Sequence, residues 1–232
     1  MLRISDLPRL DIRTVNLASD VAFTQVLALS EKTGSIVSIK VLGIYGSPRK
    51  GGNTDLLLDR ILEGAREAGA EVESLYVRRM KISGCLECGS CDDTGECAVR
   101  DDMDKVYPLL QEADIIFLAS PNFFYNVTAQ VKLLIDRSQA MWSKRLLEKT
   151  PEQRRTFDSG KGYLVCVGAT KGKNLFVGVE LTAKYFFDAL DMSYEGGLLI
   201  DRVEEKGEIL KHPDAMDRGF DLGKRAVESM KV

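Results

Sequence analysis

The segment from Ser38 to Ala70 constrains the fold more than any other part of the chain. A β-rich run, residues 39–45, leads into a loop with three glycines, and the loop leads into an apolar pattern with helical spacing. Asn53 or Thr54 is predicted to cap the start of this helix, and Gly69 is predicted to end it. A strand, a glycine-rich loop and a helix in this order predict an α/β unit.

The loop in this unit is suited to bind a phosphate group. The first turn of a helix presents unpaired N–H groups and about half a positive charge, and glycines let a ligand approach the main chain closely. The side chains that would complete the site are Ser47, Arg49, Asn53 and Thr54. The spacing matches neither the P-loop nor the dinucleotide motif, so a terminal monophosphate fits better than a bridging pyrophosphate. A glycine-rich turn that binds nothing is the alternative.

Composition limits the class of protein. The chain has 232 residues, 44% hydrophobic and 29% charged, which is enough for one large domain with an appendage. A net charge of -3 argues against a nucleic-acid or anionic-membrane partner. No apolar run approaches transmembrane length, and the first residues carry charges where a signal peptide needs an apolar core. We therefore expect a cytoplasmic protein whose cysteines are reduced or metal-bound.

Strand and helix patterns alternate about five times along the chain. Further strands are expected at 71–77, 114–120, 163–167 and 196–200. Further helices are expected at 101–112, 128–140, 181–190 and from Pro213, and the segment 143–161 is expected to be an irregular excursion from the sheet. This alternation predicts an α/β fold with a doubly wound five-stranded parallel sheet and helices on both faces. A phosphate loop after the first strand favours the flavodoxin-like strand order 2-1-3-4-5.

Residues 1–37 precede the first core strand and are predicted to form an N-terminal arm. Ser19 and Asp20 can cap a helix with an apolar stripe, which would pack either on its own domain or on a neighbouring subunit. The remaining residues, 38–232, form the predicted flavodoxin-like domain.

Three loops are expected to surround one crevice in this domain. Sheets of this kind bind ligands outside the carboxyl ends of their strands, which places residues 46–54, 121–127 and 168–172 together. The second loop is rich in aromatic residues. A flat ring between the loops, with its phosphate on the first, predicts a mononucleotide with a flat base or a flavin. Ordinary packing is the alternative for the aromatic residues.

Four cysteines have the spacing C-x2-C-x2-C-x5-C within a loop at residues 78–100. They are Cys85, Cys88, Cys91 and Cys97. Successive two-residue gaps allow a short loop to wrap a multi-iron core, whereas structural zinc usually takes two cysteine pairs that are further apart. One 4Fe-4S cluster is the first choice, and zinc or free, redox-active thiols are the alternatives.

The segments GSPRKGGNT, SGCLECGSCDDTGECAVRDDM and SPNFFYNVTAQVKLLIDR resemble the NADPH-dependent FMN reductase-like family of the flavodoxin-like superfamily, and more closely its iron-sulfur flavoproteins. The resemblance covers residues 39 to about 140 well. It implies that the domain binds FMN and that the four cysteines hold a cluster. The implied FMN contacts are Ser47, Arg49, Asn53 and Thr54 at the phosphate and Pro121, Asn122, Phe123, Phe124, Asn126, Ala169 and Thr170 near the ring. This chain departs from many relatives in the loop near the ring: it has Asn122, Phe123 and Tyr125 where they have an aliphatic residue, Tyr and Gly, respectively.

These features predict an FMN-dependent electron-transfer flavoprotein that passes electrons between FMN and the cluster or a redox partner. The cofactors carry this chemistry, so no protein side chain is assigned a catalytic role. An NAD(P)H-dependent FMN or quinone reductase with a structural cysteine loop, holding zinc or free thiols, is one alternative. A non-catalytic flavodoxin-like binding module is another. The electron donor is expected to be a small redox protein or NAD(P)H as co-substrate.

The predicted topology also bears on assembly. The cysteine loop follows the second strand, at the sheet edge, whereas the ring is expected over the third and fourth strands. Adjacent strands are about 4.8 Å apart, so the cluster and the flavin of one chain are poorly placed for direct exchange. We therefore expect a homodimer or homotetramer in which the cluster of one chain serves the flavin of its neighbour.

Overall fold

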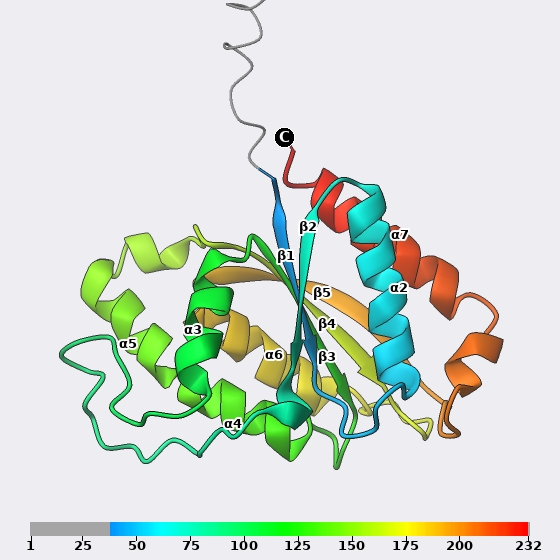
Figure 1. The fold of residues 1–232 in the computed structure, drawn as a ribbon, viewed down its shortest axis with the longest axis horizontal. Coiled ribbons are helices and arrows are strands. Elements are labelled where there is room, and N and C mark those ends of the chain that lie inside the picture. The colour runs from blue at the N-terminus through cyan, green and yellow to red at the C-terminus, as the bar shows by residue number, and fades with distance from the viewer. Residues whose placement is uncertain (1–37, 232) are drawn as a thin grey trace, which may run out of the picture. The chain divides into compact units, whose positions relative to one another are not determined.

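The computed structural model describes residues 38–231, and the predicted arm at 1–37 lies outside the described residues. The described chain forms one parallel sheet with the strand order β2-β1-β3-β4-β5 (Figure 1). The strands are β1 (Lys40–Tyr45), β2 (Glu71–Tyr76), β3 (Ile115–Pro121), β4 (Gly160–Val167) and β5 (Met192–Ile200). The predicted α/β flavodoxin-like fold is therefore confirmed.

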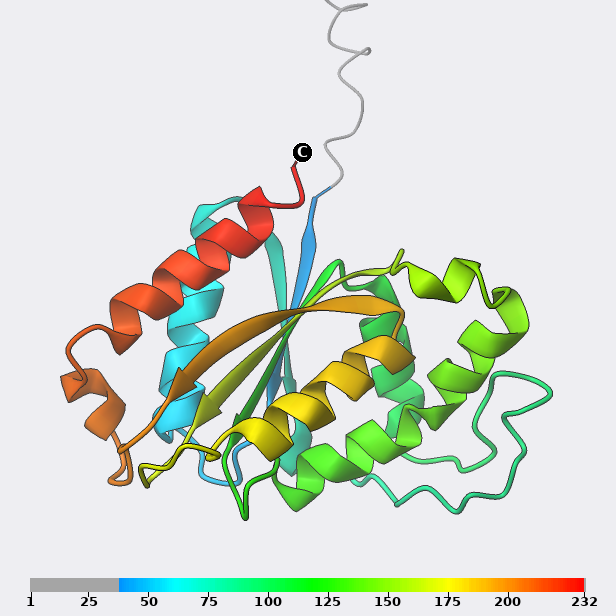
Figure 2. The same ribbon diagram turned by 180° about the vertical axis from the view of Figure 1, so that it is seen from behind.

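Helices cover both faces of the sheet (Figure 2). One face carries α2 (Asn53–Glu67) and α7 (Ala215–Glu228), and the other carries α3 (Met103–Glu112), α4 (Ala129–Arg137) and α6 (Val177–Ala189), with α5 (Gln139–Glu148) beside α6. Three short 3-10 helices, η3 (Val77–Arg79), η4 (Gln153–Arg155) and η5 (Glu208–Lys211), lie in connections. No helix within residues 38–231 is long and apolar enough to cross a membrane.

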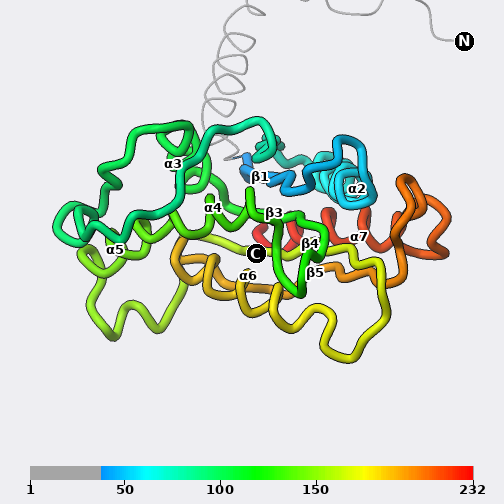
Figure 3. Tube along the Cα trace, turned by 90° about the horizontal axis from the view of Figure 1, so that it is seen from below, coloured from blue at the N-terminus to red at the C-terminus, as the bar shows by residue number. Residues whose placement is uncertain are grey.

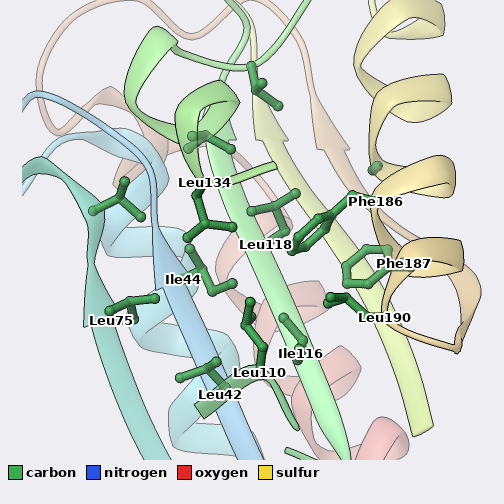
Figure 4. Packing of buried hydrophobic residues seen from close by; sticks show 14 of the residues in the cluster. Leu42, Ile44, Leu75, Leu110, Ile116, Leu118, Leu134, Phe186, Phe187 and Leu190 are labelled. Carbon is green, nitrogen blue, oxygen red and sulfur yellow. The ribbon is translucent and has the colours of Figure 1, made fainter. Parts of the chain in front are cut away.

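The hydrophobic core is divided in two by the sheet, because successive strand residues face opposite sides. In β1, Leu42 and Ile44 belong to the cluster on one face, which Leu110, Leu134 and Phe186 of α3, α4 and α6 also join (Figure 4). Val41 and Tyr45 belong to the cluster on the other face, with residues of α2 and α7. Each fully buried aliphatic side chain of this kind contributes about 1.5–3 kcal/mol to folding. Burial on both faces explains why the central strands read as nearly continuous apolar runs.

The helix expected at 128–140 is in fact two helices, α4 and α5. They meet at Ser138, a fully buried residue whose hydroxyl donates to the carbonyl of Leu134 at 3.1 Å. A serine bonded to the carbonyl four residues earlier bends a helix, so the chain changes direction here. Part of the excursion predicted at 143–161 is consequently helical, because α5 runs to Glu148.

Candidate functional site

The carboxyl ends of β1, β3 and β4 surround a cavity of about 300 Å³, within the size range of small-molecule sites. Its lining residues are Ser47, Pro48, Arg49, Gly52, Asn53, Thr54, Pro121, Asn122, Phe123, Val167, Ala169, Val203 and Glu204. Eight of the eleven residues predicted to contact FMN are among them, whereas Phe124, Asn126 and Thr170 are not. The fold thus brings the three predicted loops together around one cavity.

The first turn of α2 faces this cavity and lacks a side-chain cap. Gly52 occupies the N-cap position, and no side chain of the described residues caps the turn. The prediction that Asn53 or Thr54 caps the helix is therefore wrong. Gly51 has a φ of 62°, in the left-handed region that favours glycine. An uncapped first turn leaves N–H groups for an anion, and the helix dipole adds to the attraction.

The side chain of Asn53 is occupied by a distant segment of the chain. Its Nδ2 donates to the carbonyl of Glu205 at 2.8 Å, and its Oδ1 accepts from the N–H of Gly207 at 2.9 Å. These bonds explain why Asn53 does not cap α2. They also hold this segment so that Val203 and Glu204 line the cavity. Sequence reasoning missed both residues, because nothing local in the sequence signals a contact across 152 positions.

Buried hydroxyl groups join the loop after β3 to the loop after β1. Thr128 Oγ1 donates to the carbonyl of Gly46 at 2.7 Å, and the N–H of Thr128 donates to Ser120 Oγ at 3.1 Å. The N–H of Gly46 donates to the carbonyl of Ala119 at 2.8 Å. A Cβ at Gly46 would lie 2.5 Å from that carbonyl oxygen, so the close approach requires glycine. These contacts fix the two loops relative to each other.

Asn122 and Phe123 contribute to one wall of the cavity. Asn122 Nδ2 donates to the carbonyl of Leu175 at 2.7 Å, while the buried Oδ1 of Asn122 has no hydrogen-bond partner within the described residues. A buried polar atom without a partner costs about 1–3 kcal/mol, so Asn122 is held at this wall by its bond to Leu175 at some cost in stability. Phe123 adds an aromatic face to the same wall. The pair suits a flat ring that carries polar groups at its edge.

The tip of the loop after β3 is strained and apolar. Phe124 and Tyr125 have φ values of 49° and 63°, which non-glycine residues rarely adopt. The turn is closed by a pair of backbone hydrogen bonds between Phe123 and Asn126, at 2.8 and 3.0 Å. Phe124 is fully exposed at the tip, so the chain maintains an unfavourable backbone while presenting an apolar side chain to solvent.

The cysteine loop lies toward the opposite end of the domain from the phosphate loop, as the view onto the carboxyl ends of the strands shows (Figure 3). Cys85 and Cys88 are exposed, and Cys91 and Cys97 are partly buried. Among residues 38–231 no three Cys, His, Asp or Glu side chains lie close enough together to hold a metal ion. The donor types suit an iron-sulfur cluster, but the loop in this conformation does not bring them together.

A buried arginine closes the base of the cysteine loop. Arg137 has a fully buried side chain that donates to the carbonyls of Ser83 and Val99, at 3.1 and 2.8 Å, and to Asp101 at 2.7 Å. Burial raises the pKa of Asp101, but hydrogen bonds from the N–H groups of Ser83 and Met103 and from Arg137 outweigh it and hold that pKa below its ordinary value. Sequence reasoning missed Arg137. The one feature of the sequence that could have indicated it is the position of a charged residue close to the apolar face of α4.

Comparisons with known proteins match the same segments. Residues 39–174 match the family described as NADPH-dependent FMN reductase. An iron-sulfur flavoprotein of Archaeoglobus fulgidus is 48% identical over 99 residues, covering 43% of this chain and 45% of that protein. An iron-sulfur flavoprotein of Methanosarcina thermophila is 38% identical over 111 residues, covering 48% of this chain and 58% of that protein. The chain thus spans about half the length of these curated relatives.

A solved structure supports the fold. The NAD(P)H:quinone oxidoreductase from Methanothermobacter marburgensis superposes with a TM-score of 0.59 at 15% identity, over 84% of this chain and 98% of that one. The family match covers more than half of the chain and includes the phosphate loop, the cysteine loop and the aromatic turn. This protein therefore belongs to the NADPH-dependent FMN reductase family, a family of FMN-dependent oxidoreductases.

Proposed function

We propose that this protein is an FMN-dependent electron-transfer oxidoreductase. The observation that carries the proposal is that one cavity combines an uncapped helix N-terminus, a glycine-containing loop and the aromatic side chain of Phe123. Bound FMN supplies the interconversion of one-electron and two-electron transfer. The protein's own residues bind and orient it, and no side chain is required as an acid or base.

The proposed contacts follow the lining of the cavity. The phosphoryl end would be held by Ser47, Arg49, Thr54 and the backbone N–H groups of the first turn of α2, including that of Asn53, and the ring by Pro121, Asn122, Phe123 and Ala169. Asn126 would act through its backbone pairing with Phe123. Phe124 and Thr170 belong to the same two loops and would border the ring at the mouth of the cavity.

We further propose that the cysteine loop binds one 4Fe-4S cluster after its four thiols are drawn together. Three observations support this: the cysteine spacing, the iron-sulfur flavoproteins among the relatives, and a loop whose two ends are already held by Arg137. The separation of the loop from the phosphate loop supports a homodimer or homotetramer in which the cysteine loop of one chain lies beside the cavity of another (Figure 3).

Cofactor analysis of one anaerobic preparation tests both proposals. We expect a flavin spectrum with FMN released on denaturation, and about four irons per chain. A Cys88→Ser variant is expected to lose iron and to keep FMN, because Cys88 lies outside the cavity lining. Failure to retain FMN at micromolar concentration would contradict the flavin site. Iron-free protein with zinc on the cysteines would contradict the cluster.

The family description favours a second candidate, an NAD(P)H-dependent FMN or quinone reductase. That description names NADPH, which would serve as the electron donor. In that case the cysteine loop has a structural role only. Steady-state NAD(P)H oxidation distinguishes the two functions: an unchanged rate in Cys88→Ser supports the reductase, and loss of electron transfer to a one-electron acceptor supports the relay.

A further inference from the structure

A buried ion pair connects several points of the phosphate loop. Arg78, in η3, donates from Nη1 to the carbonyl of Ser47 at 3.2 Å and to Asp55 Oδ1 at 3.2 Å, and its Nη2 lies 3.0 Å from Asp55 Oδ2. Asp55 Oδ2 also accepts from the N–H of Gly51 at 3.0 Å. The two side chains are only 11% and 5% exposed. A single guanidinium thus joins the start of the loop to the first turn of α2.

The position of Asp55 creates an electrostatic conflict that Arg78 resolves. A carboxylate in the first turn of a helix is favoured by the helix dipole, but it repels a phosphate bound at the same end. A guanidinium in direct contact with this carboxylate cancels most of that repulsion. It also keeps Asp55 available as the acceptor for Gly51, whose left-handed backbone forms the turn of the loop.

We propose that Arg78 is a positioning residue for the phosphoryl group of FMN. It holds the phosphate loop in its binding shape through Ser47 and Asp55, and it neutralises the Asp55 carboxylate. Arg78 is absent from the cavity lining, so it acts through these neighbours and not by touching the ligand. The inference rests on the proposed flavin site and adds to it a residue from η3, an element with no other assigned role.

Comparing FMN with riboflavin tests the proposal, because riboflavin has the same ring and lacks the phosphate. Flavin-free full-length protein is titrated with each ligand, and quenching of flavin fluorescence gives the dissociation constants. In Arg78→Met the Kd for FMN is expected to rise by about tenfold or more, the scale of one lost charge-assisted contact. The Kd for riboflavin is expected to change by less than about twofold, since the ring contacts are intact.

Arg79→Met is the matched control. Arg79 and Arg78 both stack on the ring of Tyr76 at 5.0 Å, so each variant loses one positive charge and one stacking contact. Within the described part of the chain, only Arg78 of the two bonds the phosphate loop. Both dissociation constants of Arg79→Met are therefore expected to stay within about twofold of wild type.

The outcomes separate this inference from the proposed function. Wild-type protein that binds neither flavin would refute the flavin site itself. Wild-type protein that binds FMN, together with a folded Arg78→Met that keeps the wild-type ratio of FMN to riboflavin affinity, would overturn the role of Arg78 alone. If Arg78→Met does not fold, Arg78→Lys is the deciding variant, because lysine retains the charge but lacks the paired donors of the guanidinium. A partial loss of affinity for FMN alone supports the proposal. An unchanged ratio of FMN to riboflavin affinity overturns it.

Discussion

Arg137 shows how one side chain can hold a long irregular loop. Its guanidinium bonds Ser83 before the cysteines and Val99 and Asp101 after them, and it is fully buried. Arg137→Met would remove the guanidinium from Asp101 and leave the carbonyls of Ser83 and Val99 without this donor, although Asp101 keeps its bonds from the N–H groups of Ser83 and Met103. Breaking a buried pair costs about 3–5 kcal/mol. We expect the free energy of unfolding, measured in urea, to fall by that amount. Limited proteolysis is expected to cut residues 84–98 sooner than in wild type.

The exposed arginine at the end of the same loop provides the control. Arg100 has a side chain that is 68% exposed and pairs with Asp104 at 3.4 Å. Exposed pairs of this kind contribute about 0–1 kcal/mol, so Arg100→Met should change the free energy of unfolding by no more than that. Equal destabilisation by Arg100→Met and Arg137→Met would show that the burial of Arg137 and its bonds to the loop ends do not contribute to the stability of the fold.

At the scale of elements, α2 and α7 approach so closely that only glycine fits at two positions of their contact. A Cβ on Gly223 would lie 1.8 Å from the carbonyl oxygen of Ile61, and a Cβ on Gly64 would lie 2.0 Å from that of Phe220. Both obstacles are backbone atoms, which cannot rotate away. The contact also sets the position of α2, whose first turn lines the cavity.

Gly223→Ala is therefore expected to destabilise the fold. Alanine favours the helix by about 1 kcal/mol over glycine, but the clash forces the helices apart, so we expect a net loss of about 1–2 kcal/mol in chemical denaturation. In Gly219→Ala, one turn earlier, the nearest atom is the flexible end of Leu57 at 3.2 Å. In Gly219→Ala the gain in helix propensity opposes this mild contact, so the free energy of unfolding should change by no more than about 1 kcal/mol in either direction. A Gly223→Ala variant as stable as Gly219→Ala would contradict the close contact.

Local patterns predicted the elements that depend on local chemistry. The central strands were predictable because they are buried on both faces, and the three cavity loops followed from the strand order. The residue that caps α2 was not predictable, because the side-chain amide of Asn53 is hydrogen-bonded to residues near Gly207. The break at Ser138 interrupts a pattern that remains helical on both sides. Arg78, Arg137, Val203 and Glu204 were missed for the same reason, since each acts through a contact distant in sequence.

At the scale of the whole molecule, an apolar surface continues from the candidate flavin site along α6. Val177, Leu181 and Tyr185 are each more than half exposed and recur every four residues, so they share one side of the helix. A Cβ on Gly178 would lie 2.4 Å from the carbonyl oxygen of Tyr125, so the strained turn packs directly on the start of α6. A surface of this kind beside a cofactor cavity is suited to a second copy of the chain.

Leu181→Glu tests the proposed oligomer on this surface. A carboxylate there would be buried without a partner on association, whereas in the free chain it stays in water, so we expect the oligomer to dissociate while the free energy of unfolding of the monomer changes little. Size-exclusion chromatography with light scattering measures the mass. Leu210→Glu is the matched control, because Leu210 is 58% exposed and lies in η5, away from α6. Both variants add one charge to an exposed leucine, so they control for a general effect of charge on association. A lower oligomer mass in Leu181→Glu alone identifies α6 as the interface. An unchanged oligomer mass in Leu181→Glu places the contact elsewhere.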